Sequence, residues 1–139
     1  MNRRNLLPCV GMLLAVVSQE GMAAKPAYGS ANYQSTDVCS VLSNPKLFLH
    51  KEISLRGPVF VGVDGANIRD VHCQDEGIDL SVESARYEQV DIVAFFQKVR
   101  AFGGHGTATV IGEFVATASP LTTYSLSIHK VLNITRTVK

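Results

Sequence analysis

The sequence predicts a small, mainly β domain: a five-stranded Greek-key barrel with two helices, in the order α-β-β-β-α-β-β, and one disulfide. Apolar residues alternate with polar ones in segments 51–63, 106–118 and 121–135. This period of two is typical of half-buried strands. One long segment, 88–102, has helical spacing instead. Two cysteines are left once an N-terminal export signal is set aside, and an even number favours a disulfide.

Residues 1–23 have the three parts of an export signal. Arg3 and Arg4 supply a positive start, "LLPCVGMLLAVV" is an apolar run too short to span a membrane, and small residues follow in "GMAA". We expect cleavage after Ala23, which also removes Cys9. The mature protein is therefore expected in the periplasm or outside the cell.

The charge balance disfavours one class of partner. The chain carries 13 Lys and Arg against 12 Asp and Glu, a formal net charge of +1, and removing residues 1–23 leaves eleven of each. Proteins that bind nucleic acid usually have a basic excess, because counterions released from phosphates supply most of the affinity. A nucleic-acid partner is therefore not expected. No second apolar stretch is long enough for stable insertion into a membrane.

Cys39 and Cys73 are expected to form the disulfide, because exported chains fold in an oxidising compartment. The bridge closes a loop of about 35 residues and stabilises the fold by about 3–4 kcal/mol in the loop-entropy model. Zinc would need more ligands at close spacing, and a cysteine nucleophile would need a free thiolate. The histidines are expected to be separate surface residues, so we predict no metal site; they are His50, His72, His105 and His129.

A tail and a short helix are predicted before the first strand. Residues 24–35 are small, polar and aperiodic, and are expected to form a flexible tail before a single domain at 36–139. "STDVCSVLSNP" (35–45) predicts a short helix, capped by Ser35, Thr36 or Asp37 and stopped at Asn44–Pro45.

Segment 51–63 predicts the first strand. Its apolar positions share one face: Ile53, Leu55, Val59, Val61 and Val63. Gly57–Pro58 interrupts the strand, and because proline cannot donate to a ladder we expect a bulge or an unpaired position there. Asp64–Gly65 predicts a tight turn, and two short strands follow at 67–73 and 77–83.

Segment 88–102 predicts an amphipathic helix that ends at Gly103–Gly104. Its apolar residues fall on one face and are expected in the core: Ile92, Phe95, Phe96, Val99 and Phe102. Segments 106–118 and 121–135 predict the last two strands, joined by a hairpin connection at "ASP" (118–120). Lys130 occupies an expected inward position, which predicts a local bulge or the barrel rim.

Two motifs carry a resemblance. "KEISLRGPVF" is similar to the first-strand pattern G-K-x-V-x-V-R-G of small bacterial OB-fold proteins, with His50 where that pattern has glycine. "TVIGEF" resembles their fourth-strand pattern, with Gly112 as its glycine. The chain thus resembles small exported bacterial OB-fold-like proteins that contain a disulfide. The resemblance covers about 44–135 and implies the fold rather than a function. A different small α+β domain with an antiparallel sheet is the alternative.

The sequence contains no recognisable catalytic pattern. Asp75–Glu76 lacks the loop that a calcium ion needs. "GGHGT" (103–107) leads into a strand, whereas a phosphate loop leads into a helix N-terminus. We therefore predict a protein that is not an enzyme and has no cofactor.

The resemblance also implies a binding surface. OB domains usually bind along strands two and three, between two hairpin loops, which here selects Arg69 and the polar face of the first strand, with Arg56 and Phe60. "VDGAN" (63–67) and "TASPLTT" (117–123) would form the walls. In the alternative interpretation Arg56 pairs with an acid such as Glu113 and Phe60 turns inward.

Two functions are therefore open. We expect a non-catalytic binding module for a glycan, a peptide or a protein, because the chain combines an export signal, a neutral charge and a disulfide with no catalytic pattern. The alternative is an inhibitor or immunity-type protein that acts on an envelope hydrolase and plugs its cleft with one loop.

Overall fold

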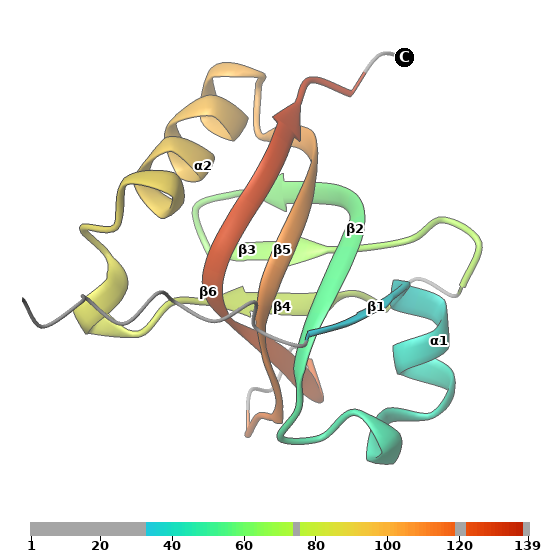
Figure 1. The fold of residues 1–139 in the computed structure, drawn as a ribbon. Coiled ribbons are helices and arrows are strands. Elements are labelled where there is room, and N and C mark those ends of the chain that lie inside the picture. The colour runs from blue at the N-terminus through green and yellow to red at the C-terminus, as the bar shows by residue number, and fades with distance from the viewer. Residues whose placement is uncertain (1–32, 74–75, 119–121, 138–139) are drawn as a thin grey trace, which may run out of the picture. The chain divides into compact units, whose positions relative to one another are not determined.

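A computed structural model describes residues 33–73, 76–118 and 122–137 (Figure 1). The predicted signal peptide (1–23) lies outside these residues, as do most of the predicted tail and most of the hairpin connection at 118–120. Of the helices in the described part of the chain, none is long and apolar enough to cross a membrane.

Five of the described strands close into a barrel. They are β2 (Glu52–Val61), β3 (Ala66–Ile68), β4 (Ile78–Ser81), β5 (His105–Ala116) and β6 (Tyr124–Thr135). Their order is β2-β3-β4-β6-β5, and β5 pairs back with β2. The β4–β6 pair is parallel, whereas the other pairs around the barrel are antiparallel. The long strands β2, β5 and β6 run alongside one another in Figure 1. This topology confirms the predicted five-stranded, OB-like Greek-key barrel.

The alternating apolar side chains of the strands fill the barrel, as the period of two predicted. The most completely buried of them include Ile53, Leu55, Val59, Ile68, Ile78, Val110, Phe114, Leu126 and Ile128. Val63 is an exception to the prediction, because β2 ends at Val61 and leaves Val63 fully exposed in the following turn.

Of the two outcomes predicted for Gly57–Pro58, a bulge or an unpaired position, the structure shows the second. β2 pairs with β5 without a break from Glu52 to Phe60, so no bulge forms there, and Pro58 is unpaired on the opposite edge of the strand. On its other edge β2 changes partner. A short strand, β1 (Gln34–Thr36), pairs parallel as far as Leu55, and β3 begins opposite Val59. Pro58 lies between these two partners, where its missing N–H is not needed, and its carbonyl accepts from the N–H of Arg69 at 3.0 Å. β1 itself was not expected from the sequence.

Helix α2 (Val90–Ala101) packs against β6, β2 and β5 and buries Ile92, Phe95 and Val99. Gly103 and Gly104 follow at φ of 85° and 84°, and the N–H of Gly104 donates to the carbonyl of Val99 at 2.9 Å. Glycine reaches this left-handed conformation without a steric penalty. The predicted helix and its glycine stop are therefore confirmed. A 3-10 turn, η2 (Ser84–Arg86), precedes the helix.

Helix α1 (Val38–Ser43) is the short helix predicted near the start of the domain, and Asp37 is its N-cap. The hydroxyl of Ser40 and then its backbone N–H donate to the Asp37 carboxylate, at 2.6 and 2.8 Å, and both bonds lower the pKa of Asp37. A 3-10 turn, η1 (Pro45–Leu47), follows α1. Val38 and Val41 bury one face of the helix in the core.

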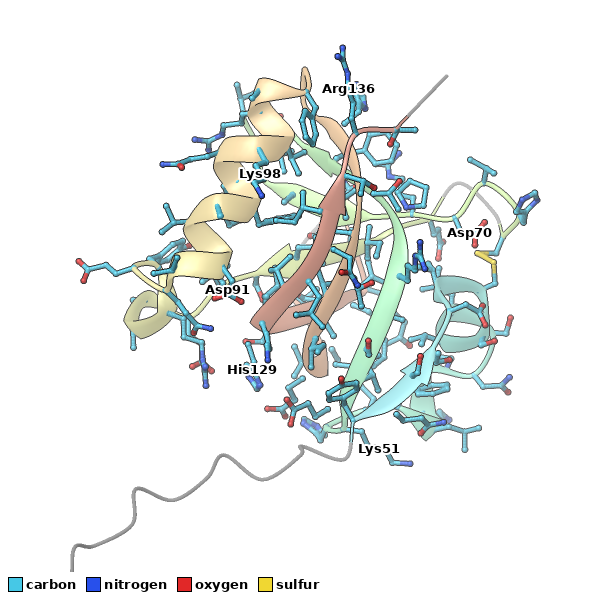
Figure 2. All side chains as sticks on the ribbon, turned by 45° about the horizontal axis from the view of Figure 1, so that its top comes forward. Lys51, Asp70, Asp91, Lys98, His129 and Arg136 are labelled. Carbon is cyan, nitrogen blue, oxygen red and sulfur yellow. A yellow bond between two sulfur atoms is a disulfide. The ribbon has the colours of Figure 1, made fainter. Side chains whose placement is uncertain are left out.

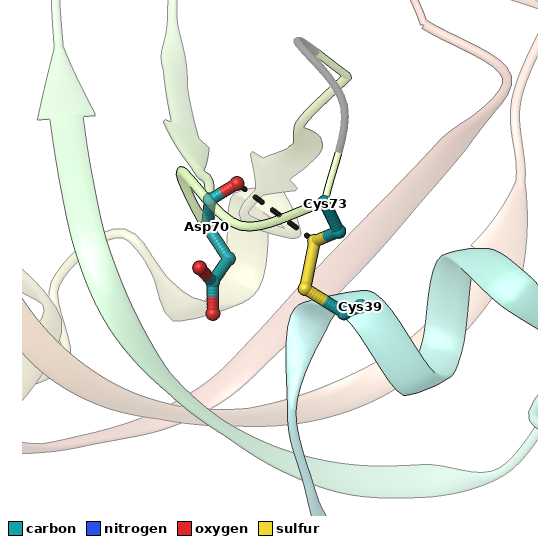
Figure 3. A group of neighbouring side chains, drawn as sticks. All are labelled: Cys39, Asp70 and Cys73. Atoms are coloured by element: carbon teal, nitrogen blue, oxygen red, sulfur yellow. Dashed lines mark hydrogen bonds between the residues drawn. A yellow bond between two sulfur atoms is a disulfide. The ribbon is translucent and has the colours of Figure 1, made fainter.

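The predicted disulfide joins Cys39 of α1 to Cys73, with their Cα atoms 5.2 Å apart (Figure 3). Cys73 was expected in a strand over 67–73, but β3 ends at Ile68, and a turn follows in which Asp70 accepts from the N–H of His72 at 2.9 Å. The Cys73 sulfur lies 3.8 Å from the carbonyl oxygen of Asp70. Since both sulfurs are oxidised, no thiol proton is donated there and neither sulfur is available to a metal ion.

The predicted irregularity at Lys130 is a bulge. Lys130 pairs with Ile111 and Ile128 pairs with the next residue, Gly112, so β6 contains one extra residue, His129. The shift leaves Lys130 exposed and places Val131 in the core.

The bulge is bonded to helix α2. The N–H of Val131 donates to Asp91 Oδ2 at 2.8 Å. Burial raises the pKa of the Asp91 carboxyl, but the bond from Val131 and one from the Gln89 side chain outweigh it, so the pKa is lowered on balance.

Candidate binding groove

An open groove of about 740 Å³ lies between the β2–β3 turn and the β5–β6 connection. Its described lining residues come from three regions of the chain. These are the β2–β4 face with the β2–β3 turn (Phe60, Val61, Gly62, Asp64, Gly65, Ala66, Asn67, Arg69, Asp79, Leu80, Ser81), the start of β5 (Gly103, Gly104, His105), and the β5–β6 region (Thr117, Thr122, Ser125). No residue of α1 is in this lining. Leu42 of α1 joins Asn67 and Arg69 in lining a smaller hollow of about 160 Å³ on the same face, so the N-terminal helix borders the face at Arg69 without lining the groove.

One end of the groove is aromatic, and Phe60 lies at its centre because of the strand register. Phe60 lies directly opposite Asn67 of β3 on one side and His105 of β5 on the other. Side chains that lie opposite each other in a sheet are close enough to touch. The rings of Phe60 and His105 meet edge to face, with their centroids 5.0 Å apart and an interplanar angle of 88°.

Arg69 covers the Phe60 ring. Its Cζ lies 5.6 Å from the ring centroid, within the range of a cation–π contact. Its Nε donates to Oδ1 of Asn67 at 2.9 Å, which holds the guanidinium in place while the side chain stays exposed. The structure thus brings together Phe60 and Arg69, two of the three residues that the sequence selected.

Hydroxyl groups and a carboxylate line the other side of the groove. Thr122 Oγ1 donates to Asp79 Oδ2 at 2.6 Å. The Ser125 Oγ lies 2.9 Å from Ser81 Oγ and 3.2 Å from the backbone oxygen of Asp79. Ser125 is only 6% exposed, so its hydroxyl lies at the bottom of the groove, where these contacts hold the neighbouring side chains in position. Polar atoms held by hydrogen bonds beside a half-buried ring suit a ligand that forms directional hydrogen bonds.

Arg56 lies apart from this arrangement. It is exposed on β2 opposite Thr109 and is absent from the described lining of the groove. Glu113, its suggested partner, instead lies 3.3 Å from His50.

Sequence reasoning placed Asn67 at the end of a wall loop and did not select Asp79 or His105 for the site. The sequence shows only that each is a polar residue within a strand or at its first position. Choosing them required the register that places Asn67 and His105 on either side of Phe60.

The formal charges around the groove are mixed. Arg69 is positive and Asp64 and Asp79 are negative, which is a net −1 for the described lining if histidine is neutral. A polyanion gains affinity from clustered cations, so this lining favours a neutral or cationic ligand over a nucleic acid.

A second hollow of about 810 Å³ shares Phe60 and His105 with the groove. Its remaining described lining is mostly apolar: Pro58, Val59, Phe102, Gly106, Arg136 and Thr137. The Phe60–His105 pair therefore contributes to the lining of both hollows.

No protein-family model matches the chain, and no curated protein matches it in sequence. The barrel and the chemistry of its groove are therefore the basis for a functional conclusion.

Proposed function

We propose that this protein is an exported, non-catalytic binding module whose groove holds a glycan or peptide segment against Phe60 and Arg69. The observation that carries the proposal is the open groove on the β2–β4 face, with an ordered arginine over an aromatic ring and a hydroxyl–carboxylate network opposite. Export to the periplasm or the medium is part of the proposal and rests on the N-terminal segment 1–23.

The chemistry of the groove supports a hydrogen-bonding ligand of low charge. An aromatic ring packs against the apolar face of a sugar or an amino-acid side chain, while the amide, carboxylate and hydroxyl groups recognise its polar edge. The alternative role, an inhibitor that plugs a hydrolase with one loop, does not require such a groove. An open face at Arg69 therefore favours the binding module.

Affinity measurements on two panels test the proposal: neutral oligosaccharides and uncharged or basic synthetic peptides. Wild type is expected to bind members of one panel, and Arg69→Ala and Phe60→Ala are each expected to weaken that binding by roughly tenfold or more, since interface arginines and aromatics often contribute more than 1 kcal/mol. Arg100→Ala, which removes an exposed arginine of α2 outside the groove, is the matched control and is expected to bind like wild type.

Three outcomes would contradict the proposal. The first is no binding to either panel. The second is capture of a stoichiometric hydrolase that is unaffected by Arg69→Ala, which would support the inhibitor instead. The third is a steeply salt-dependent affinity for single-stranded nucleic acid, which would show that phosphate contacts dominate.

A further inference from the structure

One row of side chains crosses the barrel face that carries the groove. Strand register places its four members opposite one another in turn: His105 of β5, Phe60 of β2, Asn67 of β3 and Asp79 of β4. Residues directly opposite each other point to the same face of a sheet, and all four line the groove. They are called the groove row below. It runs across the strands, from two rings at one end to a carboxylate at the other.

A hollow adjoins each end of the groove row. The hollow of about 810 Å³ is lined by His105 and Phe60, but by neither Asn67 nor Asp79. The hollow of about 160 Å³ is lined by Asn67 and Asp79, but by neither of the two rings. The groove therefore shares lining residues with a different hollow at each end of the row.

The ring end is mainly apolar. Besides the two rings, the larger hollow is lined by the half-buried side chains of Pro58 and Phe102. Its described lining also contains Arg136, which follows the end of β6 and is labelled in Figure 2. An apolar side chain gains free energy by leaving water here, whereas a basic group meets the like charge of Arg136. A sugar edge would exchange its hydrogen bonds to water for few partners.

The carboxylate end is acidic. The described lining of the smaller hollow contains Glu76 and Asp79 against Arg69, which is a formal net charge of −1. The Asp79 side chain is half-buried and accepts from Thr122 Oγ1 at 2.6 Å, so its position is fixed. An ionised carboxylate has about four acceptor sites, and a cationic donor forms the strongest hydrogen bond with it. This end therefore suits a basic group.

We propose that the ligand of the groove is an extended peptide that lies along the groove row, with an apolar side chain in the larger hollow and a basic side chain at Asp79. The inference rests on the proposed function and selects the peptide from its two ligand classes. A peptide carries both kinds of side chain, whereas a neutral sugar has no charge for the carboxylate end. Between the two ends, the guanidinium of Arg69 offers N–H donors to the carbonyls of the peptide backbone.

The spacing of the two side chains follows from the sheet. Neighbouring strands lie about 4.7–4.9 Å apart, so the three steps from His105 to Asp79 span about 14–15 Å. An extended chain covers about 3.3–3.6 Å per residue. The apolar and the basic residue of the peptide are therefore expected about four positions apart.

Calorimetry with synthetic peptides and the oxidised mature protein tests the inference. The probes are end-blocked pentapeptides with leucine at one end, lysine at the other and three small polar residues between them. Both directions are made, because a chain can lie along the row either way. We expect at least one direction to bind about tenfold or more tightly than a peptide of the same composition with leucine and lysine adjacent. Replacing lysine with glutamine, or leucine with serine, should weaken binding by a similar factor, because a charge-assisted hydrogen bond or a buried apolar side chain is lost.

Asp79→Asn tests which residue recognises the lysine. Asparagine keeps an acceptor for Thr122 but removes the charge. This variant is therefore expected to lose most of the preference for lysine over glutamine and to keep the preference for leucine over serine. Glu88→Gln is the matched control, since it removes an exposed carboxylate outside the described lining of the groove and both hollows, and it should bind like wild type. Urea unfolding shows whether each variant is folded.

Three results would overturn the inference. The first is no saturable binding of either spaced peptide up to about 1 mM. Neutral oligosaccharides that bind in the same assay would then leave the proposed function standing, whereas no binding of either class would remove both. The second is equal binding of the spaced and the adjacent peptides, which would show that the two ends of the row do not act together. The third is a lysine preference that persists unchanged in Asp79→Asn.

Discussion

Replacing Gly112 with alanine probes a very close approach between β5 and β6. A Cβ at this position would lie 2.1 Å from the backbone oxygen of Ser127, 2.7 Å from its carbonyl carbon and 3.0 Å from the Cα of Ile128. All three contacts are with backbone, which cannot rotate away as a side chain does. Carbon–oxygen contacts begin at about 3.3 Å, so the two strands must separate locally by about 1 Å.

The cost follows from that displacement. Moving paired strands by about 1 Å breaks roughly two ladder hydrogen bonds, each worth about 1 kcal/mol net, and overpacking adds about 1–3 kcal/mol. We expect Gly112→Ala to lower the free energy of unfolding by about 3–5 kcal/mol, a large share of the 5–15 kcal/mol that is typical of a domain.

Urea unfolding of the oxidised protein, followed by circular dichroism, measures the change from the midpoint and the slope. Gly62→Ala is the matched control, because no atom lies within 4 Å of an added Cβ there. We expect it to change stability by less than about 0.5 kcal/mol. A loss below about 1 kcal/mol for Gly112→Ala would refute the reasoning, since the strands would then tolerate a side chain at this close contact.

Three further predictions concern stability. His50 has a φ of 59°, so His50→Gly should raise the free energy of unfolding by about 0.5–1 kcal/mol in urea; a lower midpoint would contradict this. The double variant Cys39→Ser/Cys73→Ser should lose about 3–4 kcal/mol, and reduction of wild type should lower its urea midpoint to match; an unchanged midpoint would show that the bridge constrains little. Asp91→Ala leaves the Val131 N–H without its acceptor and should cost about 1–3 kcal/mol at pH 7. Because folding lowers the Asp91 pKa, that contribution is present above the unfolded value of about 3.9 and is lost as the pH falls through the folded pKa. The gap between wild type and Asp91→Ala should therefore narrow in acid, and a gap that widens would contradict the assignment.

Much of the fold followed from local patterns. The period of two in β2, β5 and β6 and the helical period of α2 were visible because each strand or helix buries one face in a single core. The departure of His50 from a glycine pattern now has a structural counterpart, since the backbone there adopts the left-handed conformation that favours glycine. β1 escaped prediction because its three residues are mostly exposed and show no apolar alternation.

The site was predictable in part. Phe60 and Arg69 were selected through the fold resemblance, and they meet at 5.6 Å. Arg56 was selected because it lies on the same face of β2 as Phe60. The face of a strand does not indicate how far along the strand a groove extends. His50 and His129 looked unrelated along the chain, and each lies beside a glutamate that is distant in sequence: Glu113 of β5 for His50, and Glu52 of β2 for His129.

By itself the sequence determined what depends on near neighbours: the strand and helix periods, the Asp37 cap, the glycine stop after α2 and the parity of cysteines left for a disulfide. Only the tertiary structure decided which strands are neighbours, where β6 bulges and which side chains face each other across the sheet. The reason is physical. Periodicity is set within one segment by the burial of its own face, whereas register depends on the simultaneous packing of every strand around the closed barrel.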